Sequence, residues 1–144
     1  MMLGALSLAA SAQDEGGVYI AGNGFTFEQA ANRALAQNPS GQRFFILALP
    51  PDAKALTKTA PASLVALRNR VTAANGVLMV CQRDIDSKAI SASSLIAAVV
   101  PIRGWPPPGS GALPEGQLYF PGEDTSNLPH ATEPLRRLRA TCSS

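Results

Sequence analysis

The sequence predicts an α/β protein: a three-layer α/β/α sandwich built on a mostly parallel sheet. Two runs of consecutive apolar residues, 44–49 and 77–80, are typical of parallel strands that are buried on both faces. Segments with apolar residues at helical spacing alternate with these runs along the chain. This alternation of strand and helix indicates βαβ units, whose crossovers are right-handed.

The first expected unit is a strand at 18–21 followed by a helix. Thr26 and Gln29 have the spacing of a capping box, so the helix should begin there, and residues 38–41 contain the breakers that end it. The glycine-rich segment 22–24 favours a tight turn over an anion cradle, because it lacks the third glycine and the phosphate-loop lysine. The apolar face of this helix consists of Phe27, Ala30, Ala31, Ala34 and Leu35.

Residues 44–49 form the strongest predicted strand, and Pro50-Pro51 ends it because proline cannot donate to a strand ladder. Residues 52–61 fit either a helical turn or a loop. A second helix should follow, with Ser63 as a candidate N-cap and Gly76 in the left-handed position after its end. The apolar residues of this helix are Leu64, Val65, Leu67, Val71 and Ala74.

The next strand ends at Cys81, at the carboxyl edge where open α/β sheets place reactive groups and ligands. The composition changes at Gly104, where three prolines and several glycines indicate a proline-rich loop at 104–111. The remaining predicted elements are a short helix at 84–88, a turn at 91–95, a strand at 97–103, and a C-terminal strand at 117–120 and helix at 133–141.

Residues 76–99 resemble the second half of DsrE-like proteins, a family with a sulfur-relay fold. Cys81, Ile85, Ala89-Ile90, Leu95 and Val99 fall at the spacing C-x-x-x-[LI]-x-x-x-[GA]-I-x-x-x-x-L-x-x-x-V. The resemblance implies a strand that ends in the cysteine, a short helix and a further strand. Family members commonly carry Gly-Asn-Thr after the cysteine, where this chain has Gln82-Arg83-Asp84, so the resemblance supports the fold more than the chemistry.

Composition and charge limit the classes of function. The 144 residues fit one domain. A net charge of +2 without a run of basic residues gives no electrostatic indication of nucleic-acid binding. No stretch approaches the roughly 20 apolar residues of a membrane span. His130 and two distant cysteines do not give a zinc spacing, so we expect neither metal nor cofactor.

The first twelve residues differ from the rest of the chain. Residues 1–10 are small and apolar, and Ala10-Ser11-Ala12 resembles a signal cleavage site, although the segment is short and lacks a basic start. We interpret residues 1–12 as a truncated signal segment and 13–144 as a single DsrE-like domain. The protein is then expected to be exported, soluble and periplasmic.

Cys81 and Cys142 allow two interpretations. A Cys81 thiolate would have its pKa lowered by the following helix, with Arg83 and Lys88 as supporting charges. The resemblance implies that such a thiolate carries sulfur as a persulfide, with Cys142 as a second relay thiol. Alternatively, the two cysteines form a structural disulfide, as is common in exported proteins. We favour the disulfide.

These expectations favour a non-catalytic binding or accessory module of the bacterial periplasm that is stabilised by a Cys81–Cys142 disulfide. Trp105, beside the proline-rich loop, is the candidate contact for a protein partner, and the family resemblance implies a homo-oligomer. The alternative is a sulfur-relay or thiol-redox protein that uses Cys81, which as an enzyme would be sulfurtransferase-like.

Overall fold

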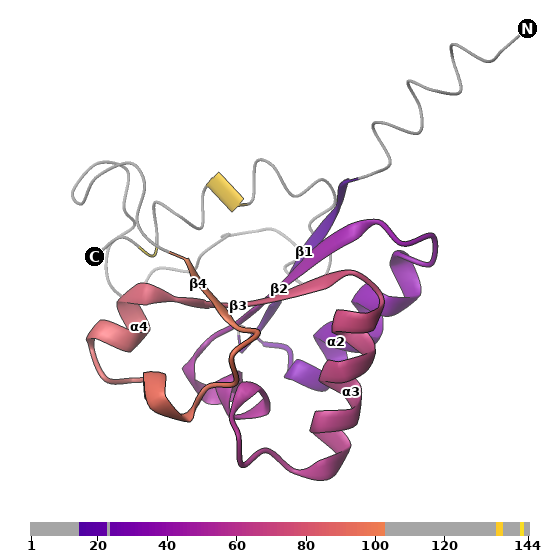
Figure 1. The fold of residues 1–144 in the computed structure, drawn as a ribbon. Coiled ribbons are helices and arrows are strands. Elements are labelled where there is room, and N and C mark those ends of the chain that lie inside the picture. The colour runs from indigo at the N-terminus through magenta and orange to yellow at the C-terminus, as the bar shows by residue number, and fades with distance from the viewer. Residues whose placement is uncertain (1–14, 23, 103–134, 137–141, 143–144) are drawn as a thin grey trace, which may run out of the picture.

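The computed structural model describes residues 15–22, 24–102, 135–136 and 142 (Figure 1). A sheet of four strands, all parallel and in the order β1-β2-β3-β4, forms its centre. The strands are β1 (Glu15–Ala21), β2 (Arg43–Ala48), β3 (Gly76–Cys81) and β4 (Val100–Ile102). The α/β class and the parallel sheet are confirmed, and the arrangement is consistent with a three-layer sandwich.

Helix α2 (Phe27–Gln37) begins as its sequence predicts. The Gln29 backbone N–H donates to Thr26 Oγ1 over 3.1 Å, and the Thr26 N–H donates to Gln29 Oε1 over 2.9 Å, which completes the capping box. The predicted apolar face is buried at Phe27, Ala30, Ala31 and Ala34. Before the helix, the Gly22 N–H donates to the Phe25 carbonyl. The turn predicted at 22–24 includes residue 23, which lies outside the described residues.

The ambiguous stretch after β2 is a short 3₁₀ helix, η1 (Pro50–Leu56), and α3 (Ala62–Ala73) follows it. The predicted cap is wrong, because α3 starts after Pro61 and has no side-chain cap, so Ser63 lies inside the helix. Asn75 (φ 78°), not glycine, takes the left-handed position after α3. Gly76 instead opens β3, where an added Cβ would lie 2.5 Å from Val71 Cγ1, so close packing requires the glycine.

The elements after β3 are shorter than predicted, or shifted. Helix α4 (Gln82–Asp86) begins directly after Cys81, two residues earlier than expected, and Lys88 beyond it has a positive φ of 70°. The predicted turn at 91–95 is confirmed as the single-turn 3₁₀ helix η2 (Ala92–Ser94), whereas β4 is only three residues long. Leu135 and Arg136, within the predicted C-terminal helix, are helical. The signal segment, the proline-rich loop and the strand at 117–120 lie outside the described residues.

The two faces of the sheet have different neighbours. Helices α2 and α3 lie side by side against one face (Figure 1) and share a core with alternate strand residues, including Tyr19, Phe44, Ile46 and Leu78. We call this the helix-covered face. The strand residues that alternate with these point to the second face of the sheet. The buried cluster on that face consists of Val18, Ile20, Leu47, Leu49, Met79, Cys81, Ile102 and Cys142.

Strand order explains this asymmetry. When parallel strands follow one another across a sheet in sequence order, right-handed crossovers all pass over the same face. The connections β1–α2–β2 and β2–α3–β3 therefore place their helices together, and no described residue of α2 or α3 belongs to the second-face cluster. In the described part of the chain, no helix is long and apolar enough to cross a membrane.

The helix-covered face also contains a buried polar network. The Asn38 side-chain amide donates to the Tyr19 hydroxyl over 3.0 Å and to the Ala34 carbonyl over 2.8 Å. The Tyr19 hydroxyl in turn donates to Gln37 Oε1 over 3.3 Å. Burial of the phenol raises the pKa of Tyr19 above its usual 10.0, while the hydrogen bond from Asn38 and the charge of Arg33 lower it to a smaller extent.

Candidate functional site

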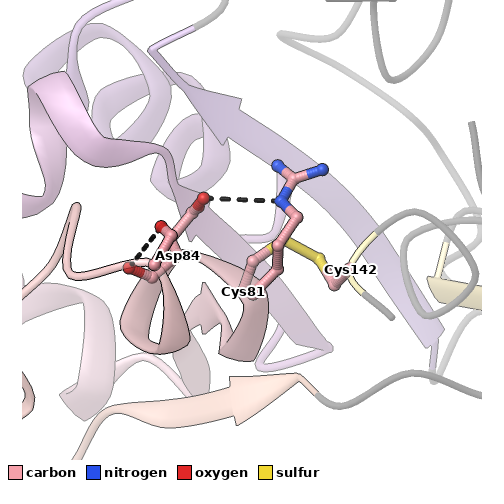
Figure 2. Close-up of polar contacts among 5 residues, drawn as sticks. Cys81, Asp84 and Cys142 are labelled. Atoms are coloured by element: carbon pink, nitrogen blue, oxygen red, sulfur yellow. Dashed lines mark hydrogen bonds and ion pairs between the residues drawn. A yellow bond between two sulfur atoms is a disulfide. The ribbon is translucent and has the colours of Figure 1, made fainter. Parts of the chain in front are cut away.

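A disulfide joins Cys81 to Cys142 at the carboxyl edge of the sheet (Figure 2). Cys81 is the last residue of β3, and its Cα atom lies 5.2 Å from that of Cys142, within the normal range for a bridged pair. Their exposed fractions are 0% and 1%. The predicted pairing is therefore confirmed, and both sulfur atoms belong to the protein interior.

The alternation of side chains along β3 decides which way Cys81 points. Leu78 and Val80 enter the helix-covered core, whereas Met79 and Cys81 enter the second-face cluster. Cys81 pairs in register with Ile102 of β4, so its neighbours on that face are apolar. Such surroundings do not suit a charged thiolate, because burial away from water penalises a charge.

Arg83, predicted to support a thiolate, forms an ion pair within α4. Its Nε lies 3.5 Å from Asp84 Oδ1, and the Asp84 side chain is only 8% exposed (Figure 2). The Asp84 carbonyl accepts from the Ser87 hydroxyl and the Ile90 N–H, which fixes the turn after α4. The positive charge of Arg83 is therefore offset by an adjacent carboxylate. Lys88, the second supporting residue, is exposed beyond the end of α4.

Other predicted site residues are not brought to this place by the described structure. Trp105, the predicted partner contact, and His130 lie outside the described residues. Among the residues that are described, no group of three or more histidine, cysteine and acidic side chains could hold a metal ion. The thiolate role of Cys81 stays a prediction, since a disulfide is what the structure contains.

Sequence reasoning missed Asp52, which caps α2 from a distance. Its Oδ1 accepts the Phe27 backbone N–H over 3.0 Å, so a carboxylate of η1 satisfies the first turn of α2. Carboxylates stabilise helix N-termini because they complement the partial positive charge there. No local pattern could reveal this contact, since 25 residues separate the partners.

A cleft of about 280 Å³ opens beside this contact. Its walls come from the start of α2, from η1 and from the start of α3, so it lies beyond the carboxyl ends of β1 and β2 and borders the helix-covered core. The lining residues are Thr26, Phe27, Glu28, Pro51, Asp52, Lys54, Ala55, Pro61 and Leu64. The cleft and Cys81 thus lie near the same edge of the sheet but on opposite faces.

Arg68 supports one wall of this cleft from inside. It is only 7% exposed, and its Nη1 donates to the carbonyls of Ala55 and Thr57 over 2.8 and 2.7 Å. Hydrogen bonds from a charged donor are stronger than neutral ones, so Arg68 anchors the end of η1 to α3. This role could not be predicted from the sequence, because an arginine on a helix is usually solvated.

Comparisons with protein-family models, with curated proteins and with solved structures find no match. The proposals below therefore depend on the geometry of this chain and on the resemblance around Cys81.

Proposed function

We propose that this protein is a non-catalytic binding or accessory module with a DsrE-like fold, exported to the bacterial periplasm and stabilised by the Cys81–Cys142 disulfide. The main observation in support of this proposal is that both cysteines are buried and bonded to one another. Disulfides persist in oxidising compartments, which supports export. We also propose a protein partner that contacts Trp105, and assembly as a homo-oligomer.

The surroundings of Cys81 favour this role over catalysis. A sulfur carrier needs a thiolate that a donor can reach, but Cys81 is fully buried and its sulfur is bonded to that of Cys142. Helix α4 has only five residues, and Arg83 beside its start is paired with Asp84, so little positive charge is left to stabilise a thiolate.

The alternative is a sulfur-relay or thiol-redox protein in which the reduced Cys81 carries the chemistry. The observation in its favour is the position of Cys81 at the carboxyl end of a strand, directly before a helix. Parallel sheets commonly place reactive groups at that edge. The two proposals differ in the resting state of the sulfur atoms, which can be measured directly.

Intact mass after denaturing alkylation tests the proposal on protein recovered from the periplasm. We expect no alkylated cysteine before reduction and two after it. The Cys142→Ser variant is the matched control, because its Cys81 must alkylate without reductant. A free Cys81 in the wild type, or one that gains about 32 Da of sulfur from a persulfide donor, would overturn the proposal in favour of sulfur relay.

A further inference from the structure

The cleft between α2, η1 and α3 has the composition of a small binding site. Its apolar lining residues are Phe27, Ala55 and Leu64, and two prolines, Pro51 and Pro61, stiffen the backbone around it. The polar residues of the lining are Thr26, Glu28, Asp52 and Lys54. An apolar surface with a few polar groups is typical of ligand sites, and rigid walls reduce the entropy lost on binding.

An anionic ligand does not suit this cleft, although a helix N-terminus faces it. The first N–H groups of α2 already have acceptors: the Phe27 N–H donates to Asp52, and the Gln29 N–H donates to Thr26. An incoming phosphate would meet the carboxylate of Asp52 where it would need donors. The internal carboxylate thus occupies the place that an external anion would take.

Charge favours a cation instead. Glu28 and Asp52 both line the cleft, and Asp52 Oδ1 accepts the backbone N–H of Phe27, the residue before Glu28, over 3.0 Å. Lys54 contributes one positive charge, which leaves the lining with one negative charge in excess. A cationic head on an apolar stem would match both features, since such side chains bury their methylene groups and keep the charge at a polar rim.

We propose that this cleft binds a lysine or arginine side chain of a protein partner, with the stem on Phe27 and Leu64 and the charged head at Glu28 and Asp52. About 280 Å³ lies just below the roughly 300–1,000 Å³ of small-molecule sites, so the cleft suits one side chain rather than a nucleotide. The inference rests on the proposed binding role, but the cleft can fail to bind while the cysteines remain paired.

The test is an NMR titration of the isotope-labelled full chain with capped single residues. Nα-acetyl-lysine methylamide and its arginine counterpart should shift the amide signals of Phe27, Glu28, Asp52 and Lys54, and added salt should weaken the binding. The equivalent capped norleucine, which has the apolar side-chain stem of lysine but no charge, should bind more weakly. Butylammonium, which has stem and charge but no peptide backbone, should also bind more weakly than capped lysine.

Charge variants sharpen the test. Glu28→Gln should weaken lysine binding about two- to fivefold, as expected for an exposed charge pair, and Lys54→Gln should strengthen it by a similar factor. Asp86→Asn, an exposed carboxylate on α4, is the matched control and should change nothing. Thermal unfolding verifies that each variant is folded.

Three results would overturn the inference: equal binding of the lysine and norleucine probes, signal shifts that avoid the cleft, or charge variants that leave the affinity unchanged. Equal affinity for butylammonium and capped lysine would overturn the protein partner as the source of the cation.

Discussion

The two faces of the sheet are covered in different ways. The helix-covered face receives α2 and α3, each of which is part of the connection between two adjacent strands. The second face receives Leu135 and Cys142, which lie far along the chain from β4 (Val100–Ile102), the last strand among the described residues. A covalent bond is present on the second face, between Cys81 and Cys142.

This difference follows from the cost of closing loops. Crossover helices cover their face as a direct result of strand connection, because the intervening chain is short. Bringing Cys142 back to β3 closes a loop of 61 residues, which costs more conformational entropy. A disulfide removes part of that cost from folding by restricting the unfolded chain. Among the described residues, the disulfide thus lies on the face that α2 and α3 do not cover.

The largest expected effect is the loss of the disulfide. Reduction, or Cys142→Ser, should lower the free energy of unfolding by about 4 kcal/mol in the chain-entropy model for a loop of this size. Urea denaturation with and without reductant measures the change. Reductant should have no further effect on Cys142→Ser, and a loss below about 1 kcal/mol would mean that the second face does not depend on the bond.

An intermediate effect is expected from adjacent residues of β2 that point to opposite faces. Ile46 and Leu47 are both 0% exposed, and Ile46→Ala and Leu47→Ala should each cost roughly 2–5 kcal/mol in the oxidised protein. After reduction, the cost of Leu47→Ala should fall by about 1–3 kcal/mol, because the cover over that face is loosened, whereas that of Ile46→Ala should stay unchanged.

A thermodynamic cycle of the two variants with and without reductant measures this coupling. Equal coupling of Ile46 and Leu47 to the disulfide would show that the two faces of the sheet unfold as one unit, and that the disulfide stabilises both faces alike.

The smallest effect concerns pH and belongs to the helix-covered face. Because burial raises the pKa of Tyr19 above 10.0, the folded state holds the phenol proton more tightly than the unfolded chain does. The stability that this proton contributes is fully present below the pKa of Tyr19 in the unfolded chain. It is lost as the pH rises through the higher pKa of Tyr19 in the folded protein.

The wild type should therefore lose more stability between about pH 9 and about pH 11 than Tyr19→Phe, as measured by urea denaturation. The comparison with Tyr19→Phe removes the contribution of lysines, which titrate in the same range. Identical pH profiles would show that Tyr19 ionises as freely in the folded state as in the unfolded one.

Local patterns predicted much of the fold. The capping box at Thr26 and Gln29 and the apolar strand at 44–49 are confirmed, because both depend on residues that are adjacent in sequence. Positions that depend on distant neighbours were mispredicted. Gly76 is required by the approach of Val71 rather than by its backbone angle.

The candidate sites divide in the same way. The sequence identified Cys81 and Cys142, since a chain with only two cysteines allows few arrangements of them. It did not identify the ion pair of Arg83 with Asp84, the cap from Asp52 to α2, or the cleft beside that cap. The cap and the cleft depend on which side chains meet after the strands have paired, and the ion pair depends on the rotamers of two adjacent side chains.

By itself, the sequence determined that this chain forms a parallel α/β sheet with amphipathic helices, because hydrophobic periodicity is a local property. Only the tertiary structure decided that the strands follow one another in order, and hence that α2 and α3 share one face. It also decided that Cys81 points to the other face, where Cys142 meets it. Such outcomes depend on the register and handedness of contacts between distant residues, which no short stretch of sequence contains.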